Sequence, residues 1–145
     1  YNDRVASGIG NFDRRADNLM QTLDRIASDL GASSAAIDNH IQHSSAFALG
    51  SSADLFYFNK GRMTGFYFIL KGLEQDFASV IEERQMQKVW KGMMDSFAES
   101  MTASHFWVMN ANPQTSIFAN HHANQGFYLQ RARTQLREVT NILLK

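Results

Sequence analysis

Residues 52–84 read SADLFYFNKGRMTGFYFILKGLEQDFASVIEER, and this long apolar run decides the fold class. Because a helix turns by about 100° per residue, the run separates into two stripes. The first stripe has the alternating three- and four-residue spacing of a surface packed against neighbouring helices. It contains Met63, Phe66, Leu70, Leu73, Phe77 and Val80. We therefore predict one central helix from Ser52 to Arg84.

The second stripe lies nearly opposite the first and consists of small residues, with two aromatic residues beside them. A glycine inside a helix costs about 0.5–1 kcal/mol relative to alanine, so three on one face indicate close approach by another backbone. A neighbouring helix of the same bundle, a second subunit, or another part of a longer parent protein could make that approach. Periodicity does not separate these alternatives. We predict a partner-contact face formed by Tyr57, Gly61, Gly65, Phe68 and Gly72.

Composition sets broad limits on the class of protein. The length of 145 residues suits one domain, so we treat residues 1–145 as a single helical bundle. Lys plus Arg equals Asp plus Glu, at 14 each, so no overall field favours nucleic acid. The absence of cysteine excludes disulfides and thiolate metal sites. Lys60, Arg62 and Lys71 interrupt the apolar run, which therefore lacks the roughly 18 uncharged residues of a membrane span.

The remaining chain is patterned for further helices. An amphipathic stripe from Phe12 to Leu30 predicts a first helix that ends at Gly31 in a left-handed cap. Ser33 and Ser34 then suit the start of a second helix. A small loop is expected at 47–52, before the central helix. After the central helix, a stripe of large apolar residues predicts a fourth helix; it comprises Met86, Trp90, Met93, Phe97 and Met101.

The C-terminal part contains an irregular connection and one more helix. The segment from His105 to Asn120 includes the only proline, Pro113, and we expect a partly buried connection there. The last helix is expected from near Asn120 to Leu143. Since short connections join successive helices, the sequence predicts an all-α fold, an antiparallel up-and-down bundle of four to five helices.

Candidate chemistry in the sequence is sparse. His40 and His43 share a helix face, and His121 and His122 are adjacent, but neither pair has the carboxylate partners of a helical metal site. The glutamates and aspartates show no convergent spacing, and no serine stands in a nucleophile motif. A basic side of the last helix could receive an anion or complement the helix dipole; it contains Arg131, Arg133, Arg137 and Lys145. We predict no catalytic residues, no metal and no cofactor.

Three stretches together resemble an uncharacterised bacterial family, domain of unknown function 2333. They are FDRRADNLMQTLDRIASDLGASSAAID at 12–38, KGR at 60–62 with its aromatic continuation, and QGFYLQRARTQLREVTNILLK at 125–145. The resemblance implies the C-terminal part of a bacterial protein anchored in the inner membrane by an N-terminal segment. The domain would then be periplasmic. The family supplies no catalytic residues to carry over, and the start at Tyr1 agrees with a fragment or a processed product.

These observations lead to two functional hypotheses. The first is a non-enzymatic structural or interaction domain of an envelope protein, whose partner is a second copy or the N-terminal part of the same protein. It contacts a membrane only through a segment outside these residues. The alternative is a sensory-type bundle that binds a small apolar or anionic molecule. A cavity lined by Trp90, Phe97 and the methionines would favour that alternative.

Overall fold

The computed structural model describes residues 3, 7, 15–43, 49–102 and 121–145. These residues form five helices and no strand, so the predicted all-α class is confirmed. The helices are α2 (Ala16–His43), α3 (Leu49–Asp76), α4 (Ala78–Glu83), α5 (Gln87–Thr102) and α6 (His121–Leu143). The predicted connection at His105 to Asn120 lies outside the described residues, as does residue Phe12.

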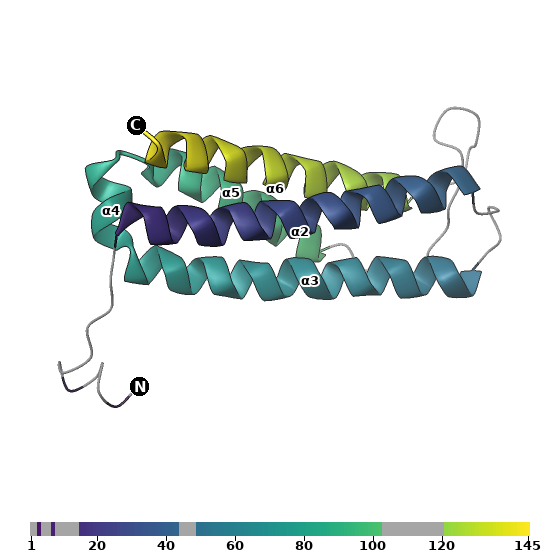
Figure 1. The fold of residues 1–145 in the computed structure, drawn as a ribbon. Coiled ribbons are helices and arrows are strands. Elements are labelled where there is room, and N and C mark those ends of the chain that lie inside the picture. Colours follow the sequence, from purple (N-terminus) through teal and green to yellow (C-terminus); the bar gives the residue numbers. More distant parts are fainter. Residues whose placement is uncertain (1–2, 4–6, 8–14, 44–48, 103–120) are drawn as a thin grey trace.

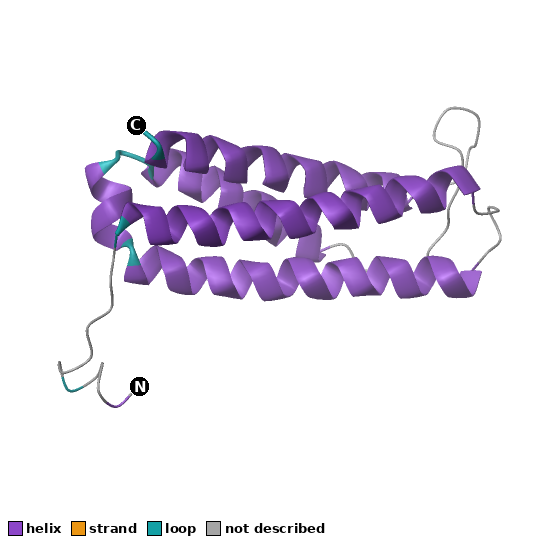
Figure 2. Cartoon of the chain, in the orientation of Figure 1, coloured by secondary structure: helices purple, strands orange, loops and turns teal. Residues whose placement is uncertain are grey.

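The four long helices run in alternating directions along one axis (Figures 1 and 2). Helix α2 runs away from the end where the C-terminus lies, and α3 returns to it. The short α4 turns across that end, α5 runs out again and α6 returns. Extensive contacts join α2 to α6 and α5 to α6, and α3 packs mainly against α5. The described residues thus form an antiparallel up-and-down bundle with α4 at one end.

One hydrophobic core runs through all the described helices. The stripe predicted for the central helix faces this core: Met63, Leu70, Phe77 and Val80 are buried, and Phe66 and Leu73 pack against it. The inward stripes of the other helices are buried as well. They comprise Leu19, Leu23, Ile26 and Leu30 in α2, Met86, Trp90, Met93 and Phe97 at α5, and Leu129, Ala132, Leu136, Val139 and Leu143 in α6. Periodicity therefore identified the core side of each long helix.

The predicted helix end at Gly31 is wrong, because α2 continues without a break to His43. Gly31 instead provides space: a Cβ atom placed on it would lie 3.2 Å from the guanidinium carbon of Arg133 in α6. Ser33 and Ser34 are not helix caps but buried residues inside α2. Ser34 Oγ accepts a hydrogen bond of 3.0 Å from Nε2 of Gln130, which joins the same two helices.

The single central helix from Ser52 to Arg84 is also wrong, since α3 begins at Leu49 and ends at Asp76. Residues 49–52 of the predicted loop at 47–52 are helical, and residues 47 and 48 lie outside the described part. At Phe77 the backbone leaves helical geometry, with φ −108° and ψ 21°. Beyond this change of direction, Val80 and Ile81 of α4 are both buried at the end of the bundle.

The connection from α4 to α5 is a Schellman motif. The Met86 N–H donates to the Ile81 carbonyl at 2.9 Å, and the Gln85 N–H donates to the Glu82 carbonyl at 3.0 Å. Gln85 has φ 54°, the left-handed conformation that this motif requires and that glycine usually supplies. The restart of the pattern near Gln85 was predicted, but this backbone conformation was not.

Candidate functional site

The side of α3 that faces away from the core is the first candidate site, and we call it the outer face of α3. Phe56, Asn59 and Met63 point into the bundle and are buried, which fixes the rotation of the helix about its axis. The residues on the opposite side must therefore face outward. All five residues of the predicted partner-contact face lie on this side: Tyr57, Gly61, Gly65, Phe68 and Gly72 are exposed.

The three glycines of the outer face border open space. A Cβ atom placed on Gly61, Gly65 or Gly72 would meet no described atom within 4 Å, apart from the local backbone of α3 itself. Among the described residues, therefore, no neighbouring helix of the bundle lies over these glycines. The sequence left open whether a helix of the same bundle, a second subunit or another part of a longer protein approaches these glycines. The described helices give no support to the first alternative.

Large apolar side chains surround the glycines. Tyr57 is 48% exposed, Phe58 62%, Phe68 62% and Ile69 51%. Single exposed apolar residues are ordinary, but a contiguous group of them usually marks an interaction surface. Sequence analysis missed Phe58 and Ile69. Both lie within about 40° of Gly65 on a helical wheel, so a projection centred on Gly65 would have found them.

One arginine borders this apolar surface. The guanidinium carbon of Arg62 lies 5.6 Å from the ring centre of Phe58 and 5.9 Å from that of Phe66. These distances are within range of a cation–π interaction, which holds the arginine side chain along the helix surface. The centre of the outer face, between Gly61 and Gly72, therefore presents apolar atoms and bare backbone, with the charge at its edge.

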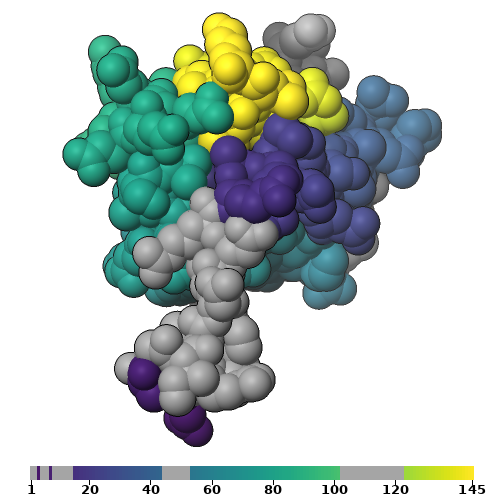
Figure 3. Space-filling model, turned by 60° about the vertical axis from the view of Figure 1, so that its left-hand side comes forward, coloured from purple at the N-terminus to yellow at the C-terminus, as the bar shows by residue number. Residues whose placement is uncertain are grey.

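An open cavity of about 560 Å³ at one end of the bundle is the second candidate. In the space-filling view (Figure 3), the start of α2, the region of α4 and the end of α6 meet at this end. The cavity has apolar and charged walls; its lining residues are Arg15, Ala16, Asp17, Met20, Val80, Glu83, Arg84, Leu143 and Leu144. Its size falls within the usual range of small-molecule sites.

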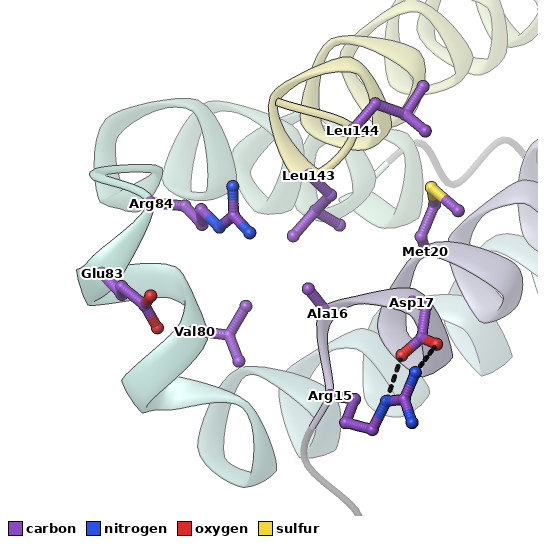
Figure 4. Close-up of a pocket in the computed structure, with 9 residues that line it drawn as sticks. All are labelled: Arg15, Ala16, Asp17, Met20, Val80, Glu83, Arg84, Leu143 and Leu144. Atoms are coloured by element: carbon purple, nitrogen blue, oxygen red, sulfur yellow. Dashed lines mark hydrogen bonds and ion pairs between the residues drawn. The ribbon is translucent and has the colours of Figure 1, made fainter.

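The charges of the end cavity are partly compensated (Figure 4). Arg15 donates two hydrogen bonds to the Asp17 carboxylate, from Nη2 at 2.7 Å and from Nε at 3.1 Å. Chiefly through this hydrogen bonding, Arg15 holds the pKa of Asp17 below its usual value of 3.8. The Arg84 guanidinium points toward Leu143 from the other wall. It forms no ion pair with any described residue of the helices around it.

A smaller cavity of about 390 Å³ lies between α2 and α6, beside Gly31. Arg133 and Arg137 line it from α6, and Asp24 and Ser28 line it from α2. The Asp24 carboxylate provides a negative charge next to the two arginines. The basic side predicted for the last helix is thus divided, because Arg131 lies 3.4 Å from Glu99 of α5 instead.

The other sequence candidates do not come together. His43 Nδ1 lies 2.9 Å from the Asn39 carbonyl of its own helix, and the described residues contain no cluster of three or more histidine, aspartate or glutamate side chains able to hold a metal ion. Trp90 and Phe97 are fully buried, and neither lines either of the two cavities described above. Among the described helices, none is long and apolar enough to cross a membrane.

Comparison of the chain with protein-family models, curated proteins and solved structures finds no match. The resemblance to domain of unknown function 2333 stays a prediction.

Proposed function

We propose that this domain is a non-enzymatic interaction module that binds a macromolecular partner through the outer face of α3. One observation carries the proposal: three glycines with open space above them lie among four exposed large apolar side chains on the same helix. The partner would be a protein, since the balanced charge of the chain gives no attraction for nucleic acid.

The energetics of α3 support this function. Each helical glycine weakens the isolated domain by about 0.5–1 kcal/mol relative to alanine, and no described contact within the bundle compensates for Gly61, Gly65 or Gly72. A partner backbone packed into the glycine groove would supply the missing contact. It would also cover Phe58, Phe68 and Ile69, whose exposure to water is unfavourable in the free domain.

The family resemblance suggests the setting for this interaction. In that setting the domain belongs to a bacterial protein anchored in the inner membrane, and lies on the periplasmic side. The partner is then a second copy of the chain or the N-terminal part of the same protein.

A site-specific photocrosslinker tests this function in the cells that produce the protein. p-Benzoylphenylalanine would replace Phe68 in one variant and Phe127 in the other. Phe127 is a matched control, because it is 60% exposed but lies on α6. We expect a crosslinked protein adduct from position 68 that is absent or much weaker at position 127. Equal yields at both positions, or none, would contradict a contact at the outer face of α3.

The end cavity supports a second candidate, the binding of a small amphiphilic anion. Arg84 would attract the acidic group, while Met20, Val80 and Leu143 would contact the alkyl part. Isothermal titration calorimetry, in which decanoate is added to the domain and the heat of binding is measured, tests this candidate. Arg84→Ala should weaken binding at least tenfold, and Arg137→Ala, outside this cavity, should leave it unchanged. Equal weakening by both variants would indicate only non-specific attraction to positive charge.

A further inference from the structure

We propose that the outer face of α3 binds a second copy of the same face, with the two α3 helices antiparallel and Gly65 at the twofold axis. This inference rests on the proposed function, because it names the partner of the same surface. It follows from the order of large and small residues along the helix. When a second α3 helix runs in the opposite direction, its glycines come close to the height of the large side chains of the first.

The relevant residues share one side of α3. At about 100° per residue, Phe58 and Gly72 lie about 20° on either side of Gly65. Gly61 lies about 40° from Gly65 and Phe68 about 60° from it, both on the same side. These residues are all exposed. They therefore form one continuous strip that a flat or cylindrical partner can contact.

Along the helix axis, the aromatic residues and the glycines are placed at matching heights. Phe58 comes seven residues before Gly65, and Gly72 comes seven residues after it. Gly61 comes four residues before Gly65, and Phe68 comes three after it. When a second helix is reversed about Gly65, its Gly72 is level with Phe58. Its Gly61 is level with Ile69 and one residue, about 1.5 Å, away from the height of Phe68. Each aromatic ring then faces a gap in the partner.

The antiparallel arrangement is favoured over the parallel one by the same order of residues. In a parallel pair with the same register, Phe58 would lie level with Phe58 of the partner and Phe68 level with Phe68. The large side chains would hold the helices apart, and the glycines would face each other across an unfilled gap. Only the reversed pair lets the backbones approach at Gly65 while the rings fill the space above Gly61 and Gly72.

Electrostatics permits this pairing and limits its strength. The chain has equal numbers of basic and acidic residues, so two copies do not repel each other through net charge. At the ends of the strip, however, Asp54 of one copy is level with Asp76 of the other, since each lies eleven residues from Gly65. This repulsion identifies a position where a change of charge should strengthen the pair.

The available area indicates a dimer that dissociates on dilution. The strip from Asp54 to Asp76 is about 33 Å long at ~1.5 Å per residue, on a helix about 10 Å wide. Such a strip buries about 500 Å² per partner, or on the order of 1,000 Å² in total, near the lower limit for a specific interface. We therefore expect a concentration-dependent equilibrium between monomer and dimer.

Cysteine crosslinking tests the geometry, because the chain contains no cysteine of its own. With a short bis-maleimide, Gly65→Cys should give a crosslinked homodimer. Asp54→Cys alone should not, since the two copies of residue 54 would be about 33 Å apart. A mixture of Asp54→Cys and Asp76→Cys chains should give the mixed dimer. Crosslinking of Asp54→Cys to itself would show a parallel pair and overturn the proposal.

Sedimentation equilibrium over a concentration series gives the second test. Gly65→Leu should reduce association at least tenfold and retain helical circular dichroism, because open space surrounds Gly65 in the monomer. Asp76→Lys should strengthen association roughly fivefold by placing a lysine level with Asp54 of the partner. Glu74→Lys makes the same change of charge on the opposite side of α3 and should leave association unchanged.

The outcomes separate this inference from the proposed function. A monomer at every concentration, without crosslinking of Gly65→Cys, overturns the second copy as partner. If the photocrosslinker at Phe68 still captures a different protein, the interaction function stands with another occupant. If the photocrosslinker also gives no adduct, both proposals are wrong.

Discussion

Gly31 in α2 and Gly65 in α3 both lie inside long helices, but their surroundings are opposite. Gly31 lies under the guanidinium of Arg133, which would be 3.2 Å from a Cβ atom at this position. Gly65 borders open space, because a Cβ atom placed on it would meet no described atom within 4 Å apart from the local backbone of its own helix. The first glycine is explained by packing inside the bundle. The second requires an explanation outside the bundle.

The comparison extends to the other described glycines. A Cβ atom on Gly126 of α6 would contact Ile37 at 3.6 Å, and one on Gly92 of α5 would contact Gln135 at 3.4 Å. Glycines at the contacts of α2, α5 and α6 thus have neighbours, whereas Gly61, Gly65 and Gly72 on α3 do not. A helical glycine therefore indicates close approach only when the rotation of its helix is known.

The largest expected difference between the two regions is in the stability of the monomer. Leu30→Ala shortens a fully buried core side chain of α2, and should lower the free energy of unfolding by about 2–5 kcal/mol. Ile69→Ala shortens an exposed side chain of α3 and should change it by less than about 0.5 kcal/mol. Urea denaturation of dilute protein measures both. A loss of similar size for Ile69→Ala would show that the outer face is covered in the monomer.

Alanine at the two glycines gives a smaller and more direct contrast. Gly65→Ala should raise the free energy of unfolding by about 0.5–1 kcal/mol, because it removes backbone freedom from the unfolded chain and no described atom obstructs the new methyl group. Gly31→Ala should raise the free energy of unfolding by a smaller amount, or lower it, because its methyl group must displace the Arg133 guanidinium. Denaturation curves recorded below the concentration of any dimer provide the comparison. Equal stabilisation by both substitutions would show that the Arg133 guanidinium does not crowd Gly31.

The sequence was sufficient for the sides of the helices but not for their ends. The spacing of Leu19, Leu23 and Leu30 directly encodes the core side of α2, because burial follows the helical period. Gly31 was misread because a cap and a close approach both favour glycine, and Arg133, a hundred residues away in the chain, decides between them. The break at Phe77 has no glycine or proline signal. Beyond the break, Val80 and Ile81 are buried at the end of the bundle, a tertiary contact that the local sequence does not encode.

The candidate sites were predictable to different degrees. The outer face of α3 could be found from the sequence, since Gly61, Gly65 and Gly72 share one side of any helix that contains them. The end cavity could not, because its walls come from three helices whose proximity depends on the tertiary fold. The Arg15–Asp17 pair is local, but only the fold places it beside Leu143.

On α3, glycines occupy helical positions where other residues are usual. Gln85 is the opposite case, since it occupies a left-handed backbone position where glycine is usual. Gln85→Gly should raise the free energy of unfolding by about 0.5 kcal/mol, because relief of strain outweighs the added freedom of the unfolded chain. Gln21→Gly, at an exposed position inside α2, is the control and should be destabilising by about 0.5–1 kcal/mol. Thermal denaturation compares the two. If Gln85→Gly is destabilising, then the glutamine side chain contributes to the turn.

The smallest effect concerns the Arg15–Asp17 pair at the start of α2. Because the folded-state pKa of Asp17 is lowered, chiefly by the Arg15 hydrogen bond, its charged form stabilises the fold above the unfolded pKa. This contribution is lost as the pH falls through the lowered pKa. Asp17→Asn should therefore reduce the melting temperature slightly between about pH 5 and 7, and the difference should shrink below pH 3.8, the ordinary value for aspartate.

Asp54→Asn, on the exposed part of α3, provides the matched control for this pH series when the protein is dilute enough to be monomeric. It removes the same charge from a position without an arginine hydrogen bond, so its effect at neutral pH should be smaller than that of Asp17→Asn. Melting curves of the three proteins across the acid range measure both differences. If the melting temperature of Asp17→Asn stays lower by the same amount at low pH, then the asparagine acts through packing at the end cavity. The Arg15–Asp17 ion pair would then not stabilise this end of the bundle. The difference in stability between the packed helices and the exposed face of α3 would come from apolar contacts alone.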